Sequence, residues 1–247
     1  MRALAGQIAL ETKLFFRRKD ELFWNLALPM FFMVLYGFLY GDTKWAEFEI
    51  RAIDYMFPGI VVMALMVNGI MVNATGFVEE RGKGIYRRLS LTPLKRQTII
   101  GAQIIHRYIV SLLQTLLLLA VGVFGFNVNI VGNYFFFWLV LTFGSLCFLS
   151  IGFALATLIR STRSATPICL IVFFMLLFLG GIFFPLNTMP DFLAIISKVL
   201  PSTNLNDALR LILIEGTGLG VAWLELLIVG AWFVVSLGLS IKFFRWE

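Results

Sequence analysis

Long apolar stretches alternate with short polar segments along the 247 residues of the chain. A bilayer core of ~30 Å is crossed by about 20 apolar residues in a helix, so each stretch is long enough to span it. The expected spans are about Leu22–Tyr40, Tyr55–Val78, Ile104–Phe126, Tyr134–Ile159, Pro167–Phe184 and Ala222–Phe244. The pattern therefore predicts an all-α integral membrane protein with six transmembrane helices, forming a single transmembrane domain over residues 1–247.

Composition agrees with a chain whose solvent is lipid. Hydrophobic residues make up 60% of it and charged residues only 14%, whereas a soluble domain averages about 25% charged residues. The net charge of +6 is expected to reflect cytoplasmic loops that follow the positive-inside rule, and no nucleic-acid partner is expected. Cys147 and Cys169 both fall inside apolar stretches and are expected to be packing residues.

Lys and Arg residues are distributed unevenly between the two sides of the predicted bundle. Sixteen of the twenty belong to one side, which carries the N-terminal segment, the segment after the second span and the C-terminal tail. The positive-inside rule then predicts that both termini are cytoplasmic, in agreement with an even number of crossings.

An amphipathic pattern precedes the first span. Ile8, Thr12 and Phe15 recur at helical spacing on one side of residues 2–19, and most charges lie elsewhere. We expect residues 1–21 to form an interfacial helix lying in the headgroup plane. A short soluble extension is the alternative.

The segment Pro185–Gly220 is too polar to span a membrane and too apolar for a solvated loop. Two short amphipathic helices are expected, Met189–Leu200 and Leu205–Ile214, the second capped by Asn204 and closed by Gly216. A re-entrant hairpin on the external side and a pair of helices lying flat on the membrane fit the pattern equally well.

A basic segment, Glu79–Arg96, separates the second and third spans and reads EERGKGIYRRLSLTPLKR. Gly82 and Gly84 would allow a sharp change of direction, and Ile85–Leu91 could form a short helix along the membrane surface. Such a helix is suited to a transient protein interface. A basic loop touching anionic lipid is the alternative.

Residues that carry chemistry are scarce in the sequence. The only Gly-Lys pair, Gly82-Lys83, is followed by Gly84 where a phosphate-binding loop requires Ser or Thr, so the chain is not expected to bind ATP or to be an enzyme. The sequence shows no catalytic constellation and no metal site. His106 is expected to be a surface or headgroup contact, and Glu225 a snorkelling or paired acid. Other acids are absent from the expected spans, which argues against ion coupling.

With these features the chain resembles the membrane subunit of a type-2 ABC transporter, an exporter permease of the daunorubicin-resistance kind. The resemblance rests on the six-span layout, on RRKDELFWNLALPMFFMVLYGFLYG entering the first span, and on a pattern in the basic segment. That pattern consists of Glu80, Gly82, Arg88, Leu89, Thr92, Pro93 and Leu94. The external segment also resembles the family's, through Pro185, Pro190, Pro201 and Arg210.

The resemblance implies partners and roles. It implies a second permease copy, so that the two permeases form a homodimer. It also implies two copies of an ABC ATPase subunit, which carries ATP and Mg. The location implied is a prokaryotic plasma membrane. The residues implied in ATPase coupling are Glu79, Glu80, Arg81, Gly82, Arg87, Arg88, Leu89, Thr92 and Pro93. Candidates for lining the pathway are Met63, Met66, Asn68, Met71, Asn73, Phe173, Phe174 and Phe178.

Flexible Met and flat Phe surfaces favour a hydrophobic drug, a lipid or a peptide-like cargo. Export of a polysaccharide or a lipid-linked glycan is the alternative within the family. An ion-coupled secondary carrier and a membrane scaffold are the alternatives from other classes.

Overall fold

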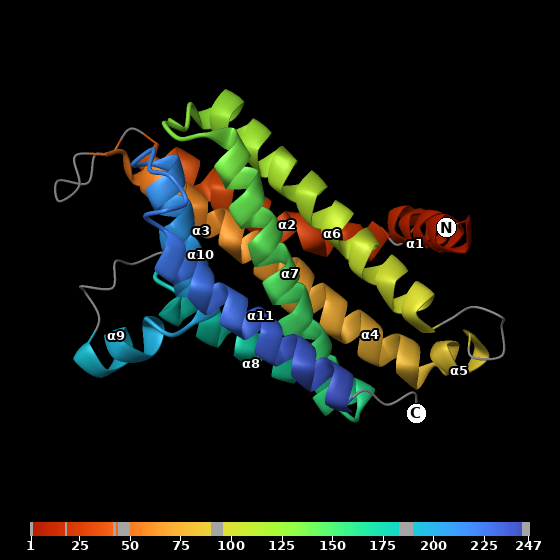
Figure 1. The fold of residues 1–247 in the computed structure, drawn as a ribbon. Helices are drawn as coiled ribbons and strands as arrows, with labels where there is room; N and C mark the ends of the chain where they lie inside the picture. Colours follow the sequence, from red (N-terminus) through yellow and green to blue (C-terminus); the bar gives the residue numbers. More distant parts are fainter. Residues whose placement is uncertain are drawn as a thin grey trace.

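The computed structural model of the chain describes residues 2–17, 19–41, 43, 50–89, 96–182 and 190–243. Within these ranges the regular elements are helices, and no strand is formed (Figure 1). They are α1 (Arg2–Arg17), α2 (Lys19–Tyr40), α3 (Ala52–Met66), η1 (Val67–Val72), α4 (Asn73–Gly82), α5 (Ile85–Leu89), α6 (Arg96–Ala120), η2 (Val121–Gly125), α7 (Tyr134–Leu158), α8 (Thr162–Leu179), α9 (Asp191–Ser197), α10 (Pro201–Leu213) and α11 (Trp223–Phe243).

Five helical stretches in the described part of the chain are long and apolar enough to cross a membrane: Ala52–Gly82, Gly101–Gly125, Tyr134–Leu158, Thr162–Leu179 and Trp223–Phe243. Within α2, the apolar part is Asn25–Tyr40, which is shorter than these. The all-α integral membrane class is thus confirmed, and a sixth crossing by α2 stays a prediction.

The column α3–η1–α4 forms the centre of the bundle. About nine-tenths of its apolar window is buried (89%), compared with 28% for α8 and 17% for α11. α11 packs along α7, which itself packs against the column (Figure 1). Helix α1, helix α5 and the end of α11 lie together at one end of the bundle, whereas α9 and α10 lie toward the other.

The column and α7 approach closely where two glycines face each other. A Cβ atom added to Gly152 would overlap the carbonyl oxygen of Gly69, and one added to Gly69 would lie 2.6 Å from the carbonyl carbon of Phe148. Small residues are what allow helix backbones to touch in lipid. Asn73 donates a hydrogen bond from Nδ2 to the Leu149 carbonyl at 3.3 Å beside this crossing.

Gly69 belongs to η1, a π-helical turn between α3 and α4. A π-helical turn widens the hydrogen-bonded ring by one residue and is most often found as a single interruption of an α-helix at a functional position. The sequence analysis predicted one regular span here, so the interruption is a feature that the hydrophobic pattern does not reveal.

Helix α10 begins earlier than predicted. It starts at Pro201, a favoured first helical residue, so Asn204 lies inside the helix and the prediction that it is the N-cap is wrong. Asn204 instead donates hydrogen bonds from Nδ2 to the carbonyls of Lys198 (2.9 Å) and Leu200 (2.8 Å), which close the preceding turn. Gly216 has a φ of 67°, as expected for a residue that ends a helix.

Two other boundaries also move. α9 covers Asp191–Ser197 and ends before the predicted Leu200, while the predicted first residue, Met189, lies outside the described residues. α8 begins at Thr162 rather than Pro167, because Ser161 accepts a hydrogen bond from the Arg163 amide at 3.3 Å and caps the helix.

Cys147 and Cys169 are fully buried, which confirms the prediction that they are packing residues.

We expect Gly152→Ala to destabilise the protein, because the new methyl group would overlap the Gly69 carbonyl. Overpacking of this kind costs about 3 kcal/mol, and we expect the melting temperature in mild detergent to fall by roughly 5–10 °C.

Gly238→Ala is the matched control, since a Cβ at Gly238 in α11 would meet no atom within 4 Å. Equal melting temperatures for the two variants would contradict the close crossing.

Candidate functional site

A tight reversal joins the central column to α5. The Lys83 and Gly84 amides donate to the carbonyls of Glu79 and Arg81, each at 2.9 Å, and Gly84 has a φ of 68°. A left-handed backbone of this kind favours glycine, so the predicted change of direction is confirmed at Gly84. The predicted short helix is present as α5, over Ile85–Leu89 of the expected Ile85–Leu91.

Tyr86 fixes α5 to the bundle through three side chains. Its hydroxyl donates to Glu80 Oε2 at 2.7 Å, and Gln103 Nε2 donates to that same oxygen at 3.0 Å and to the Tyr86 hydroxyl oxygen at 2.8 Å. The three residues come from α5, α4 and α6. The reversal is therefore held by a closed triangle of hydrogen bonds that connects two spans to the short helix.

The ring of Tyr86, like its hydroxyl group, is buried in the bundle. Only 2% of the residue is exposed, and the ring stacks on Phe77 with centroids 4.7 Å apart. Burial raises the pKa of Tyr86 well above its usual value, and the nearby Glu80 carboxylate raises it further. The hydroxyl therefore stays protonated and acts as a hydrogen-bond donor at every physiological pH.

The basic side chains of α5 remain on the surface. Arg87 and Arg88 are both exposed, next to the buried Tyr86. Glu79 and Lys83 form an ion pair beside them, but both side chains are more than half exposed, so the pair adds little stability. Leu89 is the last residue of α5, while Thr92 and Pro93 lie outside the described residues.

Arg81 and Gly82 connect the reversal to the neighbouring spans. Arg81 donates a hydrogen bond to the Ile159 carbonyl, just beyond the end of α7. A Cβ added to Gly82 would lie 3.0 Å from Oγ1 of Thr162, at the start of α8. These contacts border a surface cavity of about 580 Å³. The end of α4 thus contacts α5, the α7–α8 turn and α6.

His106 belongs to the same end of the bundle, and the prediction of a surface contact is wrong. It is only 3% exposed, because α1 packs along α6 and covers it. Its Nδ1 forms a hydrogen bond with Thr12 Oγ1 at 3.2 Å, and its ring meets Phe15 edge-on at 5.5 Å. The amphipathic N-terminal helix therefore contacts protein with the face that carries Thr12 and Phe15.

The sequence analysis missed Tyr86, Gln103 and His106 as members of one site. Gln103 and His106 are three residues apart on α6, so a polar pair on one face of an apolar helix was an available signal. Nothing in the sequence indicated that Tyr86 turns inward, because that depends on the reversal at Gly84.

The candidate pathway-lining residues occupy two kinds of position. Met63, Met66, Asn68 and Phe173 are buried in the bundle, with exposures of 0–1%, and Asn73 is 4% exposed. Met71 is half-buried. Phe174 and Phe178 point outward from α8, at 46% and 57% exposure, and their rings stack with centroids 6.0 Å apart.

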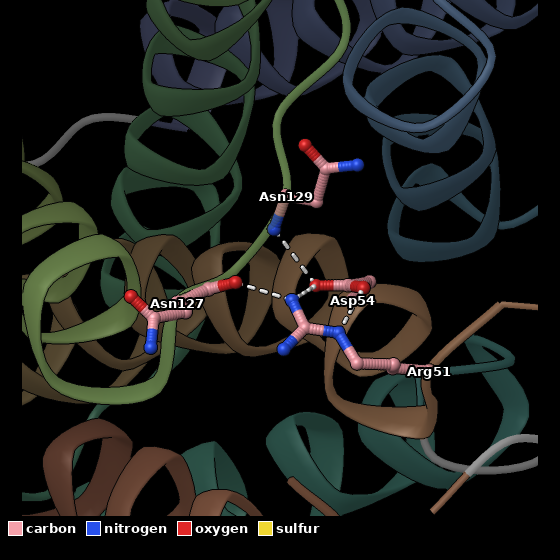
Figure 2. Close-up of polar contacts among 4 residues, drawn as sticks. All are labelled: Arg51, Asp54, Asn127 and Asn129. Atoms are coloured by element: carbon pink, nitrogen blue, oxygen red, sulfur yellow. Dashed lines mark hydrogen bonds and ion pairs between the residues drawn. The ribbon is translucent and has the colours of Figure 1, made fainter. Parts of the chain in front are cut away.

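The opposite end of the bundle carries a separate group of polar contacts (Figure 2). Arg51 donates to both carboxylate oxygens of Asp54, at 2.9 and 3.0 Å, and also to the Asn127 carbonyl. The Asn129 amide donates to Asp54 Oδ1 at 2.9 Å. This group ties the first turn of α3 to the connection between η2 and α7.

Arg210 of α10 extends the polar contacts at that end. Its guanidinium lies 3.8 Å above the ring of Tyr55 in α3 and donates to the Gly181 carbonyl at 3.0 Å. Pro190 precedes α9 and Pro201 opens α10, while Pro185 is outside the described residues. Glu225 lies in the first turn of α11, and the prediction that it snorkels or pairs stays a prediction.

In the described part of the chain, no group of three or more His, Cys, Asp or Glu side chains could hold a metal ion. The hydrogen bonds of Tyr86, Glu80 and Gln103 hold a short basic helix at the end of the most buried span.

Comparison with known proteins identifies the architecture. The model of the ABC-2 type transporter family matches residues 8–214. This chain belongs to the ABC-2 type transporter family.

Individual relatives agree with the family match. YvfS of Bacillus subtilis (strain 168), which carries the name of a transport permease, is 27% identical over 250 residues and covers 99% of this chain and 98% of its own length. ABC transporter G family member 20 of Dictyostelium discoideum is 26% identical over 201 residues, 81% of this chain. YbhR of Escherichia coli (strain K12), named as a multidrug ABC transporter permease, is 22% identical over 74% of this chain.

The chain spans 28% of the Dictyostelium relative and 47% of YbhR, but almost all of YvfS. As an ABC-2 family member with several apolar spanning helices, the chain is a multi-pass membrane protein and a transport permease of an ABC transporter.

We expect Tyr86→Phe and Gln103→Leu to destabilise the protein non-additively, because both remove hydrogen bonds from the same triangle with Glu80. A double-mutant cycle measured by thermal unfolding in detergent should give a coupling energy of about 1 kcal/mol.

Tyr108→Phe paired with Gln103→Leu is the control cycle, since Tyr108 bonds to Thr142 instead. Additive effects in the first cycle would show that the triangle is not a unit.

Proposed function

We propose that this chain forms half of the translocation pathway of an ATP-driven exporter and is coupled to a separate ATPase subunit through α5. The observation that carries the proposal is the attachment of α5. Tyr86 is buried and bonded to Glu80 and Gln103, while Arg87 and Arg88 on the same short helix stay exposed. A docking element must combine an exposed outer face with an inner face that is attached to the bundle.

The contacts around α5 suggest how force would pass into the membrane. A displacement of α5 acts on α4 through the Tyr86–Phe77 stack and on α6 through Gln103. Arg81 extends the connection to the end of α7. Because proteins are closely packed, such a displacement moves neighbouring helices together instead of being absorbed locally. In this proposal α1 braces α6 through Phe15 and His106.

The proposed assembly has two ATPase subunits and a second, identical permease copy. ATP and Mg would bind to the ATPase subunits, and this chain would carry no cofactor. The exposed aromatic face of α8, with Phe174 and Phe178, supports a pathway wall or a contact with the second permease copy. With α1, α5 and the end of α11 at one end of the bundle, the charge distribution supports a cytoplasmic location for both termini.

The proposed cargo is a hydrophobic drug, a lipid or a peptide-like molecule. Aromatic and Met side chains suit apolar surfaces of varied shape, and YbhR, a relative, is named as a multidrug permease. Export of a polysaccharide or lipid-linked glycan remains the second candidate within the family.

Reversing the charge of α5 with Arg87→Glu and Arg88→Glu should lower ATPase activity of the assembled transporter at least tenfold. Acidic side chains would repel the groups of the partner that attract arginine, and both arginine side chains are exposed. ATP hydrolysis in reconstituted liposomes is the measurement, with the amount of inserted permease as the reference.

Arg160→Glu with Arg163→Glu is the matched control, since these two exposed arginines lie near α4 but outside α5. Equal losses in the two double variants would show a general charge effect and would remove α5 from the interface.

A direct test of the partnership is to purify the tagged chain from gently solubilised native membranes and to identify co-purifying subunits by mass. We expect an ATP-binding subunit that is lost when residues 85–94 are replaced by a Gly/Ser linker. A chain that purifies alone in every mild detergent would favour a self-contained carrier or a scaffold.

A further inference from the structure

Uncharged polar side chains gather where α2, α6 and η1 meet, deep in the bundle. Gln114 donates from Nε2 to the backbone carbonyl of Asn25 at 2.7 Å. Asn68 donates from Nδ2 to Ser111 Oγ at 2.5 Å and to the Arg107 carbonyl at 2.9 Å. Thr115 follows Gln114 on α6, and all of these polar side chains are at most 1% exposed. The group is called the α2–α6–η1 polar cluster: Asn25, Asn68, Ser111, Gln114 and Thr115.

The hydrogen-bonding capacity of this polar cluster is only partly used. Among the described residues, partners are lacking for both side-chain amide atoms of Asn25 and for Asn68 Oδ1, Gln114 Oε1 and Thr115 Oγ1. Leaving a buried polar atom without a partner costs about 1–3 kcal/mol, and a bilayer offers no water from outside to reduce that cost. Several such atoms at one helix junction indicate that something polar binds there.

The polar cluster lies far from the external surface. Asn25 is fifteen residues before the end of α2, and Asn68 is sixteen residues after the start of α3. At a rise of 1.5 Å per helical residue, these positions are about 22–24 Å from the external ends of their helices. Gln114 is eleven residues before Gly125, or about 16 Å by the same rise. Headgroups on the external side therefore cannot supply the missing partners, whereas at the other end Asn25 lies six residues, or about 9 Å, from Lys19 at the start of α2.

The chemistry of the unpartnered atoms defines the ligand. Amide and hydroxyl oxygens that can accept a hydrogen bond outnumber the donors, and the five side chains carry no charge. Asn25 lacks partners at both amide atoms, so exchanging its oxygen and nitrogen leaves the conclusion unchanged. Such a set favours a small uncharged group that donates hydrogen bonds, which is a hydroxyl group or water.

We propose that the α2–α6–η1 polar cluster is a binding site for uncharged hydroxyl groups within the membrane, occupied either by water molecules or by a hydroxyl group of the cargo. The two sources share the same chemistry and are separated by the test below. Of these residues only Asn68 was a candidate for lining the pathway, and the other four members of the polar cluster were not predicted. The presence of the site depends on neither the cargo nor the ATPase partner, whereas its occupation by a cargo hydroxyl rests on the proposed amphipathic cargo.

Thiol chemistry can report whether this polar cluster is hydrated. A cysteine reacts as its thiolate, which needs a polar, accessible surrounding to form. We would replace Cys147 and Cys169 by alanine and introduce Thr115→Cys in the assembled transporter in native membranes. The probe is 2-aminoethyl methanethiosulfonate, and its reaction rate is measured by mass spectrometry.

Leu118→Cys is the matched control. Leu118 is equally buried, lies three residues further along α6 and belongs to the hydrophobic core. We expect Thr115→Cys to react at least tenfold faster than Leu118→Cys. If Thr115→Cys fails to insert, Gln114→Cys replaces it, with the same expectation.

Adding daunorubicin, an amphipathic molecule with hydroxyl groups, separates the two sources. Protection of Thr115→Cys by daunorubicin supports a cargo hydroxyl in the site, and fast labelling without protection supports water. Labelling of Thr115→Cys and Gln114→Cys as slow as that of Leu118→Cys would overturn the proposal. Because no outcome depends on ATP hydrolysis, the site and the proposed coupling to an ATPase can fail separately.

Discussion

The contact between the backbones of η1 and α7 at Gly69 and Gly152 sets the geometry of this bundle. Lipid provides no hydrophobic force to bring helices together, so close backbone packing must do so. Because the two glycines allow that approach, α7 lies directly against the central column, and Asn73 reaches the Leu149 carbonyl across it. α11 is then placed by α7, and α4 carries the reversal at Gly84 to one end. Gly82, where α4 ends next to this reversal, is thirteen residues beyond Gly69, or about 20 Å along the column.

Two polar groups at opposite ends of the column serve different purposes. The Arg51–Asp54 group and the Arg210–Tyr55 contact fix the start of α3 to the η2–α7 connection and to α10. The Tyr86–Glu80–Gln103 triangle fixes α5 to the other end. The column is therefore held at both of its ends by polar contacts, and its middle is held by close packing together with the hydrogen bonds of Asn68 and Asn73.

Much of the architecture could be predicted from sequence because lipid imposes simple rules. Apolar length predicts spans, charge asymmetry predicts sides, and glycine with a short basic run predicts a reversal. The apolar part of α2, Asn25–Tyr40, is shorter than the five spanning stretches, so length alone does not identify α2 as a span. Asn204 was misassigned because asparagine suits two roles: it can cap the start of a helix, and from inside a helix it can donate a hydrogen bond to a preceding carbonyl, as it does here. His106 was misassigned because its burial depends on α1 folding back onto α6, a tertiary contact that no local pattern contains. Tyr86 and Gln103 are brought together by the same kind of long-range contact.

The π-helical turn of η1 has a consequence for how the faces of this span are counted. Each residue of an α-helix advances the side-chain direction by about 100°, and a π-helical turn contains one residue more than the regular count. Residues on either side of Val67–Val72 therefore belong to two helical wheels rotated against each other. The relative directions of the Met63 and Asn73 side chains therefore cannot be read from a helical wheel that treats the span as one regular helix. In related sequences, an insertion or deletion of a single residue within 67–72 would turn the half of this span that ends at Gly82, with Glu80 and the reversal, to a different neighbour.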